Sequence, residues 1–470
     1  MSNYPPLNWS DEEFESWRYK QDDYADKVAE AIMHSPHHIE VYQALGNIQK
    51  NSDPVDIKIF DLPQHKGREL GKDHEDLVAI LDEYFSNKVH FEFTDEQRKV
   101  ITKASEFYSG RISDCTLALA VRSLLKQYAA FKATNVLVFT KLLTQYPHRR
   151  ILETMQFVMD VMDPKGMEPD GYAIRSIQKL RLVHAMIRCR IKHGGYDVST
   201  FGEFNSKEWG LAINQQDMIL AIHTFSIEVI DGLKANDEMM TDDDIENFYV
   251  CWHYYARALG VMDEINPTTY ADGKALQERI YKSQFTDPNP NGPMLAEPLI
   301  TFLQEIMPFR PKLADIYAVI KMYNDEKDYE PIFQNILKIP LNTANDHLLT
   351  FMRDADKLMH GILFLKYLFT PNHKKKSMYN AMVMTQYNLL DKVVNVEKTW
   401  GDKHFRVADG FGDAFAKEDA KKTEDRPSFF VWVIHRIFFK DDHAKEKTFI
   451  HKMFDAVFMH QEKNQDEYLK

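Results

Sequence analysis

Apolar side chains recur every three or four positions through most of this chain, which is the spacing of amphipathic helices. Alternation with a period of two residues, which would indicate strands, is scarce. In the stretch "QKLRLVHAMIRCRIKH", which begins at Gln178, Leu180, Ile187 and Ile191 share one side of a helix at about 100° per residue. The pattern predicts an all-α fold, organised as a single large helical domain.

Capping signals predict where several of these helices begin. Ser10 with Glu13 three residues later is the pattern of a capping box. Asn214 and Thr241 each precede an apolar-periodic stretch with acidic residues in its first turn. Pro147 suits the first position of a helix, where its missing N–H costs nothing. We therefore expect helices to start directly after or at these residues.

The chain divides at two changes of composition. The most hydrophobic block begins at Ser113, and the strongest break is the segment "DPNPNGP" that begins at Asp287. We expect an N-terminal helical region at 1–112, a core at 113–286 and a C-terminal helical region at 287–470. A chain of 470 residues can bury a core of this size.

Bulk composition excludes several classes of protein. The net charge of −13 argues against a nucleic-acid partner, which would require a basic excess. The 3 cysteines are far apart and form neither a disulfide framework nor a CxxC site. No apolar run is long enough to span a membrane, and no export signal is recognisable at the N-terminus. These features predict a cytoplasmic protein.

Common catalytic and metal-binding motifs are missing from the sequence. It contains no GxxxxGK[ST] phosphate loop, no GxGxxG turn, no HExxH and no GxSxG. His34, His37 and His38 lie close together, but the last two are adjacent and would point apart on a helix. This cluster therefore predicts a surface loop rather than a metal site.

Three helical residues carry the chemistry that remains. Arg150 and Thr154 lie one turn apart on an apolar face, and His184 lies between an aliphatic stripe and the flank that carries Arg181 and Arg188. A local reading is open for two of them, because Thr154 could bond to its own helix and His184 to a backbone carbonyl. Arg150 cannot lose its charge and requires a partner. If these residues converge, they form an apolar slot with one imidazole and several cations, the combination that haem requires.

The segments "VRSLLKQYAA", "TKLLTQYPHRRILET", "KLRLVHAMIRCR" and "INQQDMILAIHTF" resemble the rubber oxygenase family. The resemblance runs from about Val121 to Met262. Its signature is an Arg and a Thr four positions apart, followed by a His thirty positions later. Arg150, Thr154 and His184 reproduce both spacings without a gap.

The resemblance implies an all-helical, globin-like core around a b-type haem. His184 would be the iron ligand, Arg150 and Thr154 would line the haem pocket, and Arg181 and Arg188 would supply further cations at its edge. Characterised relatives use dioxygen to cleave carbon–carbon double bonds of isoprenoids. The expected partner is therefore an apolar unsaturated small molecule or lipid, whereas no catalytic side chain is carried over.

This sequence also departs from the family pattern. Glu153 stands where latex clearing proteins have a lysine that can cap the iron. Without that lysine, two alternatives remain open: a haem-binding or gas-sensing protein without oxygenase turnover, and a helical scaffold without a cofactor. His223 and His253 are reserve candidates for the iron ligand.

The stretch "SFFVWVIHRIFF", which covers 428–439, is aromatic and nearly all apolar but too short to span a bilayer. It could pack in the core, cover a cavity or contact a membrane surface.

We expect core packing or a cavity lid for 428–439, so the full chain should stay in the supernatant when it is centrifuged with liposomes. A chain that ends before Pro427 is the control. Sedimentation of the full chain, lost in the shortened chain, would instead assign this stretch to a membrane surface.

Overall fold

The computed structural model describes residues 4–35, 41, 45, 48–53, 72–139, 147–193, 203–286, 288–306 and 311–354. All of them belong to one compact unit, made up of Met1–Ile306 and Arg310–Lys422. A second unit comprises Met307–Phe309 and Thr423–Lys470, outside the described residues. The stretch 428–439 therefore also lies outside them, and its role stays a prediction.

The described residues form helices connected by turns, without a strand; one isolated bridge joins Ala130 and Phe285. The all-α prediction is confirmed. The helices of the described ranges are η1 (Pro5–Leu7), α1 (Asp11–Ser16), η2 (Trp17–Tyr19), α2 (Asp23–His34), α4 (Lys72–Ser86), η4 (Val89–Phe91), α5 (Asp95–Gly110), α6 (Ile112–Ala118), η5 (Leu119–Ser123), α7 (Leu124–Ala129), α8 (Phe131–Phe139), α10 (Pro147–Met162), α11 (Ala173–Lys192), α13 (Ser206–Trp209), α14 (Gln215–Ala235), α15 (Asp242–Ala258), η6 (Asp263–Ile265), α16 (Tyr270–Gln284), α17 (Asn291–Ile306), α18 (Leu313–Met322), α19 (Glu326–Asp328), η7 (Tyr329–Ile336) and η8 (Leu341–Thr343).

The predicted helix starts are confirmed, since each depends on contacts within one turn. Ser10 Oγ accepts from the Glu13 N–H at 3.1 Å, and the Glu13 carboxylate accepts from the Ser10 N–H at 2.7 Å. Thr241 forms the same capping box with Asp244 at the start of α15, and the Asn214 side chain caps α14 by accepting from the Asp217 N–H. Pro147 is the first residue of α10.

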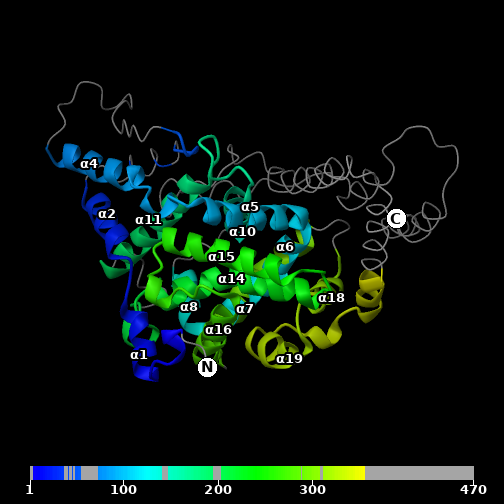
Figure 1. Cartoon of the computed structure of the whole chain (residues 1–470). Helices are drawn as coiled ribbons and strands as arrows, with labels where there is room; N and C mark the ends of the chain where they lie inside the picture. The colour runs from blue at the N-terminus through cyan, green and yellow to red at the C-terminus, as the bar shows by residue number, and fades with distance from the viewer. Residues whose placement is uncertain are drawn as a thin grey trace, which may run out of the picture. The chain divides into compact units, whose positions relative to one another are not determined.

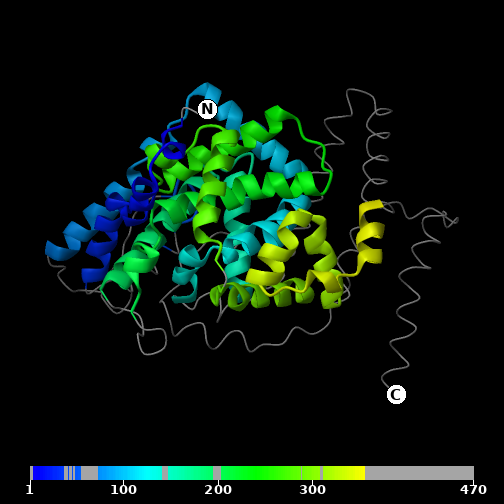
Figure 2. The same ribbon diagram turned by 90° about the horizontal axis from the view of Figure 1, so that it is seen from below.

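Helices α14 and α15 lie at the centre of the described fold (Figure 1). α14 packs against α15, α16, α6, α7 and η5. The segments α1–α4 and α18–η8 lie on opposite sides of these central helices (Figure 2). α17, which follows the predicted break at 287, packs against α7, α8 and α10. Within the described ranges, each helix is too short or too polar to traverse a lipid bilayer.

A buried network of charges joins the π-helical turn η5 to α14. The Arg122 Nε lies 2.7 Å from Glu228 Oε2, and both side chains are 2% exposed. Lys126 Nζ lies 3.4 Å from the same oxygen and 2.7 Å from Asp328, and the Tyr281 hydroxyl donates to Glu228 at 3.0 Å. Burial alone would raise the pKa of Glu228, but Lys126 and Arg122 outweigh it and lower that pKa to about 2.

Helix α11 is enclosed on almost every side and lies along α2. The two helices run in the same direction. Three acidic residues, Asp22 directly before α2 and Asp26 and Glu30 within it, pair in the same order with cations along α11. We call these three residues, Asp22, Asp26 and Glu30, the carboxylate ladder. Their partners on or next to α11 are Arg181, Arg188, Lys192 and His193.

We expect Arg122→Met to lower the free energy of unfolding by about 3–5 kcal/mol, because it leaves the Glu228 carboxylate buried without its closest cation. Urea unfolding followed by circular dichroism measures the loss. Lys103→Ala is the matched control, since Lys103 pairs with Asp243 on the exposed surface at 2.8 Å. Equal midpoints for the two variants would show that the buried network does not stabilise the fold.

Candidate functional site

Helices α10 and α11 pack directly against each other and bring Arg150 and His184 into one electrostatic environment. Burial is the main reason that the pKa of His184 is lowered to about 3, and the charges of Arg188 and Arg150 lower it further. Asp22 acts in the opposite direction with a smaller effect. His184 is therefore a neutral imidazole at neutral pH, with a lone pair on one ring nitrogen.

One ring nitrogen of His184 has no local partner in the part of the chain that the structure describes. This nitrogen, Nδ1, is buried and forms no hydrogen bond there. The backbone carbonyl that the sequence allowed as a partner is thus not found there. A buried polar atom without a partner costs free energy, so a ligand that binds the ring would relieve this cost.

Arg150 and Thr154 lie on the facing helix. The Thr154 hydroxyl donates to the Arg150 carbonyl at 2.9 Å, the local bond that the sequence analysis left open. The Arg150 guanidinium binds Glu153 at 2.5 Å, and its side chain is 34% exposed. Glu153, the departure from the family pattern, is therefore the anionic partner of Arg150. The apolar face around them is formed by the buried residues Ile151, Met155 and Val158.

Arg181 and Arg188, both on α11, differ in how many of their N–H donors form hydrogen bonds. Arg181 binds both oxygens of Asp22, with Nε at 2.6 Å and Nη2 at 2.8 Å, so its forked donors are occupied. Arg188 binds Asp26 through Nε at 2.7 Å, whereas its Nη1 is buried without a hydrogen-bond partner among the described residues. Arg188 thus has donor capacity left for a ligand, and Arg181 mainly holds α11 against the residue that precedes α2.

Sequence reasoning missed Asp22 and Asp26 as the partners of these arginines. The signal was present, because two acids four positions apart share one face of a helix and can meet a row of cations on another. Gly260 completes this contact. It has a φ of +93°, and a side chain there would collide with the Asp22 carboxylate.

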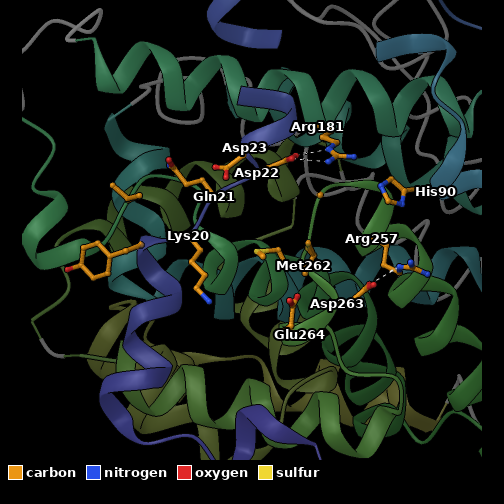
Figure 3. A pocket seen from close by; sticks show the side chains of 14 residues that line it. Lys20, Gln21, Asp22, Asp23, His90, Arg181, Arg257, Met262, Asp263 and Glu264 are labelled. Atoms are coloured by element: carbon orange, nitrogen blue, oxygen red, sulfur yellow. Dashed lines mark hydrogen bonds and ion pairs between the residues drawn. The ribbon is translucent and has the colours of Figure 1, made fainter. Parts of the chain in front are cut away.

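A pocket of about 660 Å³ opens beside Arg181 (Figure 3). Its wall consists of Tyr19–Asp23, His90, Arg181, Leu211, Arg257 and Gly260–Glu264. Arg181–Asp22 and Arg257–Asp263 form ion pairs across this wall. The lining is mixed polar and apolar, with several charged side chains, and His184, Arg150, Thr154 and Arg188 do not line the pocket. It therefore differs from the apolar slot that the sequence predicts.

The reserve ligands lie elsewhere. His223, on α14, is fully buried, and its Nε2 lies 3.5 Å from the Tyr249 hydroxyl. Burial lowers the pKa of His223 to about 3, with only the distant Glu228 acting against it. His253, on α15, is partly exposed, and burial lowers its pKa as well. Neither Arg150 nor Arg188 contributes to the lowered pKa of His223 or His253.

Comparisons with known proteins identify the region that contains this site. Residues 109–322 match the family described as "ER-bound oxygenase mpaB/B'/Rubber oxygenase, catalytic domain". The chain is 26% identical over 157 residues to the rubber oxygenase of Streptomyces sp. (strain K30). That match spans 33% of this chain and 37% of the relative, so it covers well under half the length of the curated protein.

The fold is also similar to a solved structure of the latex clearing protein in its closed state. The TM-score is 0.54 at 18% identity, covering 78% of this chain and 91% of the other. The resemblance to the rubber oxygenase family, inferred from the sequence, is confirmed. Arg150, Thr154, Arg181, His184 and Arg188 all lie within the matched region.

We expect the cofactor-free protein to lose stability as the pH falls from about 6.5 toward about 3. In this window the unfolded chain takes up a proton at His184, whereas the folded chain, with its lowered pKa, does not. Between about pH 6.5 and 5, His184→Leu should therefore lose roughly 2 kcal/mol less than the wild type. Urea midpoints across this range measure the difference.

The exposed His347→Gln is the control for the removal of a histidine. It should follow the wild-type pH dependence. If His184→Leu follows it too, the imidazole is not held neutral in the folded protein.

Proposed function

From the premise that residues 109–322 form a catalytic domain of the mpaB and rubber oxygenase type, we propose that this protein is a haem b-dependent oxygenase. It uses dioxygen on an apolar unsaturated substrate of isoprenoid or lipid character. The observation that supports this most directly is that Arg188 and Arg150 act on the neutral imidazole of His184, whose buried Nδ1 has no partner among the described residues. His223 and His253 also have an unpartnered Nδ1 among the described residues, but neither has these two cations beside it.

The residues at this site fit haem in their chemistry. A neutral imidazole is the usual protein ligand of haem iron, and His184 is kept neutral by burial and by two neighbouring cations. Arg150 is one-third exposed and Arg188 has a free Nη1, so both can bind the propionates. Thr154 lines the same helix face. Arg181 contributes indirectly, since it fixes α11 through Asp22.

Haem, when bound, would supply the redox-active iron that dioxygen chemistry requires. The chain supplies the surroundings. The buried side chains of Ile151, Met155, Val183 and Ile187 lie on the two helices that carry Arg150 and His184, and they exclude water from the site. An apolar environment favours an apolar alkene over polar substrates. Glu153 places a carboxylate beside Arg150, where the relatives carry a lysine.

We expect the purified protein, supplied with haem during expression, to show a Soret band with one haem per chain. His184→Ala should lose the haem or change its axial-ligand spectrum, because the ring is the proposed iron ligand. His253→Ala is the matched control and should leave the spectrum unchanged. A colourless wild type, or an unchanged spectrum for His184→Ala, would contradict the proposal.

Turnover separates an oxygenase from a haem-binding or gas-sensing protein. We expect incubation of the haem-loaded protein with polyprenyl lipids and oxygen to give carbonyl products, detected by mass spectrometry. His184→Ala should reduce product to the background level. A stable haem protein that gives no product with any unsaturated lipid would favour the sensing function.

A further inference from the structure

A second group of metal-binding side chains lies at the far end of the carboxylate ladder. Glu30 and His34 are one turn apart on α2, and His193 directly follows α11. One ligand atom from each of the three residues lies within 4.8 Å of the others. Glu30 Oε2 is 2.9 Å from His193 Nε2 and 3.5 Å from His34 Nδ1. The two imidazole rings meet edge to face, with centroids 5.5 Å apart.

We propose that Glu30, His34 and His193 bind a divalent transition-metal ion of the Zn²⁺ class, at a site distinct from the haem site. Zn²⁺ accepts histidine nitrogen and carboxylate oxygen at about 2.0–2.2 Å, which places two ligand atoms about 3.3 Å apart in a tetrahedral site. The observed separations of 2.9 and 3.5 Å bracket this value. Three protein ligands leave the fourth position to water.

The site is accessible to solvent, and a metal there would replace existing hydrogen bonds of its ligands. The side chains of His34, His193 and Glu30 are 69%, 48% and 27% exposed. His34 Nδ1 donates to the Glu30 carbonyl oxygen at 2.8 Å, so this nitrogen must lose its proton and leave the carbonyl before it can bind a metal. Two groups compete for Glu30: the Cys189 thiol, which hydrogen-bonds to its carboxylate, and Lys192, whose Nζ lies 2.8 Å from Glu30 Oε1. The Lys192 side chain is 71% exposed, so it can turn into solvent when a metal binds.

A metal here would link α2 to the C-terminal end of α11, the helix that carries His184. Glu30 is the third residue of the carboxylate ladder, and the other two form ion pairs with Arg181 and Arg188. The bound ion would join α2 to the end of α11 more tightly than the pairs with Lys192 and His193, because metal–ligand bonds are shorter and directional. Neither the proposal nor its test depends on haem binding.

The test uses the full chain, without a histidine tag, and Zn²⁺ as the probe in competition with a chromophoric chelator. We expect the wild type to bind one Zn²⁺ that is weakened at least about tenfold in His34→Ala and in His193→Ala. Zn²⁺ should raise the melting temperature of the wild type and not that of His193→Ala.

Two matched variants complete the design. Lys192→Met removes one competitor and should bind Zn²⁺ at least as tightly as the wild type. His347→Ala removes an exposed histidine outside the cluster and should bind normally. Wild-type affinity in both His34→Ala and His193→Ala would overturn the proposal, and so would a tenfold loss in Lys192→Met. The Soret band of each variant reports separately on the haem site.

Discussion

The ion pairs between the carboxylate ladder and α11 are the interaction on which the candidate site depends. Arg181 and Arg188 are enclosed in the fold, and a guanidinium cannot be neutralised by losing a proton. Asp22 and Asp26 supply the opposing charges from one helix turn. Because α11 also carries His184, the same pairs hold the helix that bears the imidazole against α2.

Burial, reinforced by the charges that remain near His184, explains why the ring stays neutral. Asp22 occupies the donors of Arg181, whereas Arg188 and Arg150 still act on the imidazole. A cation close to a buried histidine disfavours its protonated form, as burial itself does. These two effects preserve the lone pair that a metal requires.

Glu153 is the anionic partner of Arg150 in this chain. Its carboxylate lies 2.5 Å from an Arg150 nitrogen, so the positive charge at this edge of the site is partly compensated. The pocket beside Arg181 is a separate feature, and the Arg181–Asp22 pair forms part of its wall.

The sequence by itself determined the helical class, the helix starts at Ser10, Pro147, Asn214 and Thr241, and the spacing of the Arg150, Thr154 and His184 triple. Caps and helical faces depend on residues three or four positions apart, so the sequence displays them directly. Only the tertiary structure decided which groups neutralise the arginines and that His193 meets Glu30, 163 positions away. Such long-range pairs have no period along the chain, and they form only when packing brings two helix faces together.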